Sequence, residues 1–137
     1  MKKQLSFQLT WTCDIACKHC CQDHTRLSLD VATARKTIDG FYTSGLIDSV
    51  GFSGGEVFEE YEALVALTQY CHRYDLPVGL VTNANWARTY DVAYRKLEPL
   101  VYCGLKTVCV SYDAYHAQFV PYRQVLHALE AAQTFGL

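Results

Sequence analysis

Apolar and polar positions along this chain fall into four units, each a strand followed by a helix. Residues 5–10 alternate apolar and polar side chains, which predicts the first strand, and shorter apolar runs predict strands at 50–53, 78–81 and 107–111. The fourth run is β-branched and continuous, which is typical of a strand buried on both faces. Such strand–helix repetition predicts a parallel α/β sheet with right-handed crossovers.

The intervening segments carry apolar stripes at helical spacing. Ser28 is the expected N-cap of the first helix, and Gly45 and Gly104 are the expected ends of the first and third helices. The four stripes are Val31, Ala34, Ile38, Phe41 and Tyr42; Tyr61, Leu64, Val65, Thr68 and Cys71; Ala93, Leu97, Leu100 and Val101; and Val125, Leu126, Leu129 and Ala132.

Composition excludes several classes of protein. The chain has 137 residues, of which half are apolar and 19% are charged, so it can build a core and is not intrinsically disordered. Its net charge of -2 gives no basic field for nucleic acid. No uncharged apolar stretch approaches the roughly 18 residues of a membrane span, and the N-terminus lacks the apolar core of a signal peptide. We therefore expect a cytoplasmic protein that binds neither nucleic acid nor membrane.

Length bounds the architecture. A closed eight-unit barrel needs roughly 250 residues, so four units form only half of one. Four units alone would also leave an unpaired parallel edge strand, which soluble proteins usually cover. We expect residues 1–137 to form one domain that is the front part of a longer protein.

The seven cysteines are distributed unevenly. Cys13, Cys17, Cys20 and Cys21 lie within nine residues, whereas three others, Cys71, Cys103 and Cys109, lie in apolar segments and are expected to be core thiols. An odd count with one dense group does not favour a disulfide scaffold. It indicates one metal or cofactor site.

Polar segments follow all four predicted strands, where the active sites of parallel α/β proteins gather. These segments are residues 13–20, 53–56, 82–85 and 111–116. Three thiolates at spacings of four and three residues suit zinc or an iron–sulfur cluster. In the cluster, three ligands leave one iron open; in the zinc alternative, Cys21 or His24 completes a closed site.

The CxxxCxxC spacing, followed by Gly-Gly-Glu after the second strand, resembles the radical S-adenosylmethionine enzymes. The resemblance implies a partial (βα) barrel with helices on its outer face, of which this chain supplies about four of six units. It implies that Cys13, Cys17 and Cys20 bind a [4Fe-4S] cluster whose fourth iron binds S-adenosylmethionine. The implied cofactor-binding residues are His19, Gly54, Gly55, Glu56, Thr82, Asn83, Ser111 and Asp113. Val57 departs from the family, which commonly has proline there.

By this resemblance the protein is an oxidoreductase-type enzyme that generates a 5′-deoxyadenosyl radical, and no side chain is assigned as a general acid or base. Its expected partners are an electron donor of flavodoxin or ferredoxin type and a peptide, protein or small-molecule substrate, with peptides favoured. The alternative is a truncated, non-catalytic scaffold that binds zinc or an iron–sulfur cluster. A thiol redox protein is disfavoured, because it would leave Cys13 and the Gly-Gly-Glu segment unexplained.

Overall fold

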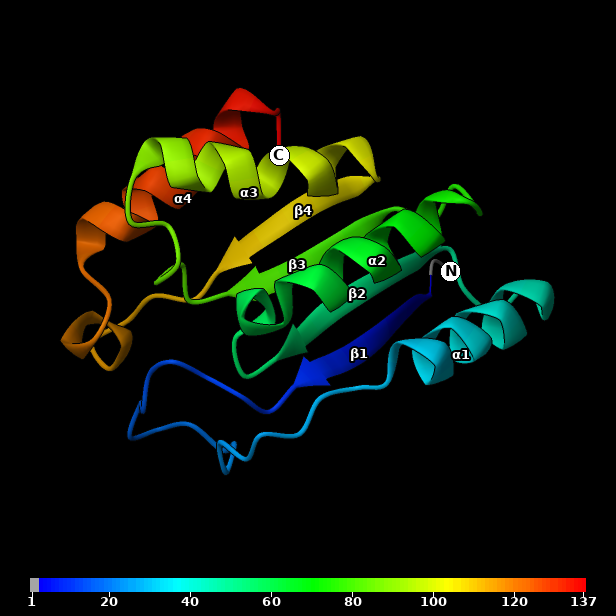
Figure 1. Ribbon diagram of the computed structural model, residues 1–137, viewed down its shortest axis with the longest axis horizontal. Helices are drawn as coiled ribbons and strands as arrows, with labels where there is room; N and C mark the ends of the chain where they lie inside the picture. Colours follow the sequence, from blue (N-terminus) through cyan, green and yellow to red (C-terminus); the bar gives the residue numbers. More distant parts are fainter. Residues whose placement is uncertain (1–2) are drawn as a thin grey trace.

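Among the residues that the structure describes, four parallel strands form one sheet in sequence order. The computed structural model describes residues 3–137 and pairs β1 (Gln4–Thr10) with β2 (Ser49–Gly54), β2 with β3 (Val78–Thr82), and β3 with β4 (Leu105–Val110). The helices are α1 (Val31–Thr43), α2 (Tyr61–His72), α3 (Tyr90–Tyr102) and α4 (Tyr122–Thr134), with short 3₁₀ turns η1 (Val57–Glu60) and η2 (His116–Gln118). The four predicted units and the parallel sheet are confirmed (Figure 1).

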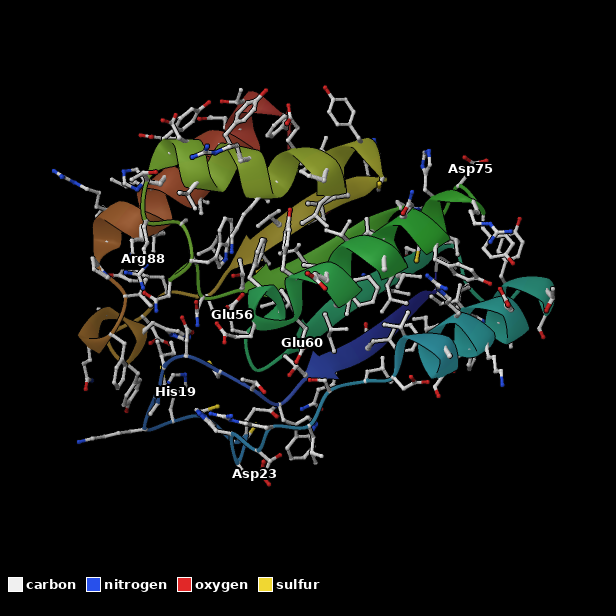
Figure 2. The ribbon with its side chains drawn as sticks, viewed as in Figure 1. His19, Asp23, Glu56, Glu60, Asp75 and Arg88 are labelled. Carbon is white, nitrogen blue, oxygen red and sulfur yellow. The ribbon has the colours of Figure 1, made fainter. Side chains whose placement is uncertain are left out.

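The helices follow one another across one face of the sheet, because α1 contacts α2, α2 contacts α3, and α3 contacts α4. Apolar strand residues point toward this helical layer and are buried, among them Val50, Phe52, Val78 and Leu80. Leucines of α2 and α3 complete the core, namely Leu64, Leu67, Leu97 and Leu100. Burial of such a side chain stabilises a fold by roughly 1.5–3 kcal/mol. Side chains fill the space between the two layers (Figure 2), as expected for an α/β partial barrel.

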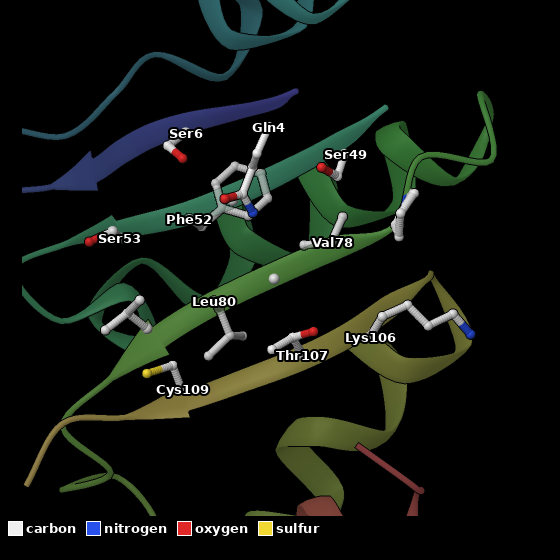
Figure 3. A pocket seen from close by; sticks show the side chains of 14 residues that line it. Gln4, Ser6, Ser49, Phe52, Ser53, Val78, Leu80, Lys106, Thr107 and Cys109 are labelled. Carbon is white, nitrogen blue, oxygen red and sulfur yellow. The ribbon is translucent and has the colours of Figure 1, made fainter. Parts of the chain in front are cut away.

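The opposite face of the sheet is open. Ser6, Gly51, Gly79 and Thr107 lie beside one another in the strand register. Because these residues are small, they form the floor of a groove of about 410 Å³ whose lining comes from the strands and their ends (Figure 3). The groove runs along the face that becomes the interior when such a sheet curves into a barrel.

The prediction that the fourth strand is buried on both faces is wrong. Thr107 and Cys109 of β4 are exposed on the open face, while Leu105 and, in part, Val108 are covered by helices. β-Branched residues favour a strand without showing how many of its faces are covered, which explains the error. Cys109 is therefore not a core thiol. Cys71 is buried as predicted.

The first helix begins two residues later than predicted. The carboxylate of Asp30 accepts a hydrogen bond from the backbone N–H of Thr33 at 2.8 Å, so Asp30 is the N-cap. Ser28 instead pairs with Thr10 at the end of β1 and donates a hydrogen bond to Glu60. The predicted ends of α1 and α3 are confirmed.

Two predicted helix faces are confirmed only in part: Ala34 and Ile38 of α1 and Val125 and Ala132 of α4 are buried as predicted, but other members of the two faces are exposed. Leu126 and Leu129 of α4 are exposed, whereas Ala128 and Ala131 are buried, because small residues let α4 approach α3 closely. Phe41 and Tyr42 of α1 also remain exposed at about 40%. None of the helices in residues 3–137 has the length and apolar character needed to cross a membrane.

Candidate functional site

The carboxyl ends of the four strands converge on one cavity. All four arrowheads point to the same end of the molecule, where the loop after β1 and the segment between β4 and α4 also lie (Figure 1). The cavity measures about 130 Å³. Its lining is Cys13, Ile15, Cys17, His19, Cys20, His24, Ser53, Gly54, Gly55, Val81, Thr82, Asn83, Ser111 and His116. The structure thus brings together every predicted site residue except Glu56 and Asp113.

The cysteine loop, residues 11–29, has no regular secondary structure apart from one bridge to β1. Its two ends are joined by hydrogen bonds from Trp11 N to Leu27 O and from Leu29 N to Leu9 O, both 2.8 Å long. Within the loop, Cys20 N donates to Cys17 O at 3.0 Å. The loop therefore closes on itself and presents its thiols to the ends of the strands.

Burial disfavours the thiolate form of two cysteines in this loop, Cys13 and Cys17. Burial raises the pKa of Cys13 to about 11, and burial together with the charge of Asp113 raises the pKa of Cys17. Reactive cysteines require a lowered pKa, so this environment argues against a thiol redox enzyme. A bound metal centre would displace the thiol protons and stabilise the thiolates.

Spacing of the thiols distinguishes a single ion from a larger cluster. A zinc ion holds its sulfur ligands at about 2.3 Å, so any two of them lie within about 4.6 Å. Among residues 3–137, the cysteines are not among the groups of three whose ligand atoms all lie within 4.8 Å. An iron–sulfur cluster accepts wider spacing, because each cysteine binds a different iron. Three cysteine thiols line this cavity, and three thiolates are the donor set that a cluster with one open iron would require.

Two glycines let the end of β2 approach the cysteine loop closely. A Cβ atom at Gly54 would lie 2.2 Å from Thr10 O, and one at Gly55 would lie 2.1 Å from Thr12 O. This contact is secured by hydrogen bonds from Gly55 N to Thr10 O and from Glu56 N to Thr12 O, at 2.7 and 2.8 Å. The glycines are thus required by packing within the protein as well as by their place on the cavity.

Glu56 connects two strand ends from beneath the cavity. Its carboxylate is almost fully buried and accepts hydrogen bonds from Thr82 Oγ1 and Asn83 N at 2.8 Å and from Phe58 N at 3.1 Å. Burial outweighs these bonds and raises the pKa of Glu56 to about 7. Its carboxylate thus holds the ends of β2 and β3 together through these hydrogen bonds.

Asp14 joins the cysteine loop to the end of β3. Asn83 Nδ2 donates to Asp14 Oδ1 at 3.0 Å and lies 3.8 Å from Cys13 Sγ, while Asn85 Nδ2 donates to Asp14 Oδ2 at 2.6 Å. Sequence reasoning missed Asp14 because nothing in the spacing of the cysteines marks the residue between them. Its bond to Asn83 fixes Cys13 over the cavity.

Aromatic and charged side chains form the rim of the cavity. The ring of His19 lies 4.5 Å from that of Tyr115 and 5.3 Å from that of His116 (His19 is labelled in Figure 2). Asp113 Oδ1 accepts hydrogen bonds from the backbone N–H groups of His116 and Tyr115, which help hold its pKa at about 2. His116, which belongs to the polar segment expected after the fourth strand but was given no role from the sequence, also lines the cavity.

Comparisons with known proteins find two similar chains, and no family model matches. YydG of Bacillus subtilis (strain 168), which is named for peptide biosynthesis, is 26% identical over 136 residues, or 97% of this chain and 43% of YydG. An S-adenosylmethionine-dependent nucleotide dehydratase of Selenomonas ruminantium is 29% identical over 87 residues, or 62% of this chain and 31% of the dehydratase. The chain thus spans less than half the length of either relative.

Proposed function

We propose that the chain is a member of the radical S-adenosylmethionine superfamily and that it binds a [4Fe-4S] cluster and S-adenosylmethionine in the cavity at its strand ends; its similarity to YydG and to the S-adenosylmethionine-dependent dehydratase supports this family. The observation that carries this proposal is the common lining of that cavity. Segments from all four strand ends meet there, although in the sequence they are separated by whole helices.

Each group of residues then has a distinct task. Cys13, Cys17 and Cys20 are the cluster ligands, and they would bind the cluster as thiolates. The bound cofactors supply reductive cleavage of the C5′–S bond and the 5′-deoxyadenosyl radical that removes hydrogen from a substrate. The protein supplies position and exclusion of water.

The remaining cavity residues hold S-adenosylmethionine. Backbone groups of Gly54 and Gly55 line the cavity without side chains in the way, and Thr82, Asn83 and Ser111 add polar groups. His19 and Asp113 contribute an aromatic ring and a carboxylate at the rim. Glu56 acts indirectly, because it fixes Thr82 and Asn83.

The proposed substrate is a peptide or protein that the enzyme modifies. Support comes from the name of YydG, a relative matched along nearly the whole chain. The groove on the open face of the sheet reaches Ser53 and Val81, which also line the cavity, so a substrate lying in it would approach the proposed radical. A flavodoxin or ferredoxin is the proposed electron donor.

Anaerobic reconstitution of the chain with iron and sulfide tests the proposal. We expect a [4Fe-4S] electron paramagnetic resonance signal after reduction and formation of 5′-deoxyadenosine when S-adenosylmethionine and dithionite are added. Cys17→Ser should lose both. Cys21→Ser is the matched control, because Cys21 lies in the same loop but does not line the cavity, and it should retain both. Absence of both the signal and the cleavage, together with stoichiometric zinc that Cys17→Ser removes, would instead support the scaffold alternative.

A further inference from the structure

We propose that His19, Asp113 and His116 form a second site, which binds a divalent first-row transition-metal ion independently of the three cysteines. One ligand atom from each residue lies within 4.8 Å of the other two. Asp113 is central, because its Oδ1 lies 2.9 Å from His116 Nδ1 and its Oδ2 lies 3.6 Å from His19 Nε2. The site joins the cysteine loop to the segment between β4 and α4.

The donor set determines which ions the site takes. Two imidazoles and one carboxylate suit zinc, iron(II) and related ions, which bind nitrogen and oxygen at about 2.0–2.2 Å. Calcium and magnesium prefer oxygen ligands alone and are disfavoured. Three protein ligands leave at least one position open, and that position is near the cavity because His19 and His116 both line it.

The ligands are partly ordered before any ion binds. Asp113 is fixed by the backbone N–H groups of Tyr115 and His116, at 2.8 and 3.0 Å, and the ring of His19 packs on that of Tyr115. A metal bond forms in the plane of an imidazole, so it leaves the second face of the His19 ring free. Binding of an ion is therefore compatible with the place of His19 beside the proposed cofactor.

Charge at the site also favours a cation. In residues 3–137, the ion pairs of Asp113 are formed with His19 and His116, and no lysine or arginine neutralises its carboxylate. The side chains of His19 and Asp113 are 40% and 47% exposed, which gives an ion access from solvent. A divalent ion would compensate the carboxylate and fasten the cysteine loop across the mouth of the cavity.

Zinc titration of a Cys13→Ser, Cys17→Ser, Cys20→Ser variant tests this site separately from the proposed function, because that variant has lost the cluster ligands. Calorimetry should show one bound ion per chain. Added zinc should also slow tryptic cleavage after Lys18 in the same loop. In this background His116→Gln and His19→Gln should each weaken zinc binding at least about tenfold and abolish the protection.

His24→Gln is the matched control, since His24 lies in the same loop and lines the cavity but does not belong to the group of three. This variant should bind zinc like its parent, and circular dichroism should confirm that every variant is folded. Absence of zinc binding in the parent, or binding that His116→Gln and His19→Gln both leave unchanged, would overturn the proposal.

Discussion

Two glycines show how single positions differ in what they tolerate. Gly55→Ala places a methyl group 2.1 Å from the backbone oxygen of Thr12, so the strand end and the cysteine loop must separate. We expect a loss of about 1–3 kcal/mol in the free energy of unfolding. Gly40 lies in helix α1, and a methyl group there would have no atom within 4 Å. Gly40→Ala should therefore raise the free energy of unfolding by about 0.5–1 kcal/mol. Urea denaturation measures both, and equal effects would contradict this account.

Glu56 should make stability depend on pH. Because burial raises its pKa from 4.5 to about 7, the unfolded chain ionises first as pH rises. The free energy of unfolding should therefore fall between about pH 4.5 and pH 7 and then level off. Glu56→Gln should remove this part of the pH dependence. At neutral pH the variant should still be less stable than wild type by about 1–3 kcal/mol, because an amide nitrogen would face the N–H of Asn83 or the hydroxyl of Thr82.

Denaturation with urea at pH 5 and pH 8 measures the change. Glu62→Gln, at an exposed position in α2, should leave the pH dependence as in wild type. A Glu56→Gln variant with the full wild-type dependence on pH would show that another group carries it.

Also at the residue scale, the sequence was most informative for residue types that serve only a few purposes in proteins. The cysteines and the glycine pair were identified because few other residues serve those purposes. Asp14 was not identified, because its partner Asn83 is distant in the sequence. His116 was given no role, because it meets its partner Asp113 only through a turn. Glu56 was predicted to contact the cofactor, and in the structure its buried carboxylate accepts a hydrogen bond from Thr82, which the sequence did not indicate.

At the scale of helices and strands, one carboxylate adds hydrogen bonds to the docking of α1, which also buries Ala34 and Ile38. Asp39 of α1 accepts hydrogen bonds from the hydroxyls of Tyr70 in α2 and of Tyr74, at 2.7–2.8 Å. These bonds lower the pKa of Asp39, with that from Tyr74 as the largest cause. Asp39→Ala keeps good helix propensity but removes the acceptor. We expect faster amide hydrogen exchange in α1 and unchanged exchange in α3, which packs elsewhere.

Hydrogen-exchange mass spectrometry provides the readout for this variant. Lys36→Ala, an exposed change on the same helix, should leave α1 at the wild-type rate. Equal acceleration in α1 and α3 would mean that Asp39 stabilises the whole fold and not the docking of one helix.

Elements were easier to predict than their environments. Apolar spacing located all four helices and strands, because period is a local property of the chain. It failed for the open face of β4 and for the exposed leucines of α4, since these depend on which neighbours cover them. Ala128 and Ala131 are buried because two helices approach closely, and their small side chains give a weak signal in the sequence.

At the scale of the whole molecule, the cavity depends on segments that only the assembled sheet brings together. The order of the strands is the order of the sequence, so each strand end lies beside the next and each loop adds to the site in turn. The cysteine loop is attached to this frame by Gly54–Gly55 and by Asp14, with no helix or strand of its own. A metal centre bound by three cysteines of this loop would make the loop rigid.

Binding of the proposed cluster should therefore stabilise the entire chain. In a His116→Gln background, which lacks the second metal site proposed above, cluster loading should raise the free energy of unfolding by about 2–3 kcal/mol and Tm by about 10 °C. Cleavage by trypsin after Lys18 should slow, and removal of iron by a chelator should restore it. With Cys17→Ser added, treatment with iron and sulfide should change neither quantity. Cluster loading that leaves Tm and cleavage unaltered would mean that the loop is already held by the sheet, and that the cysteines lie in place before any metal arrives.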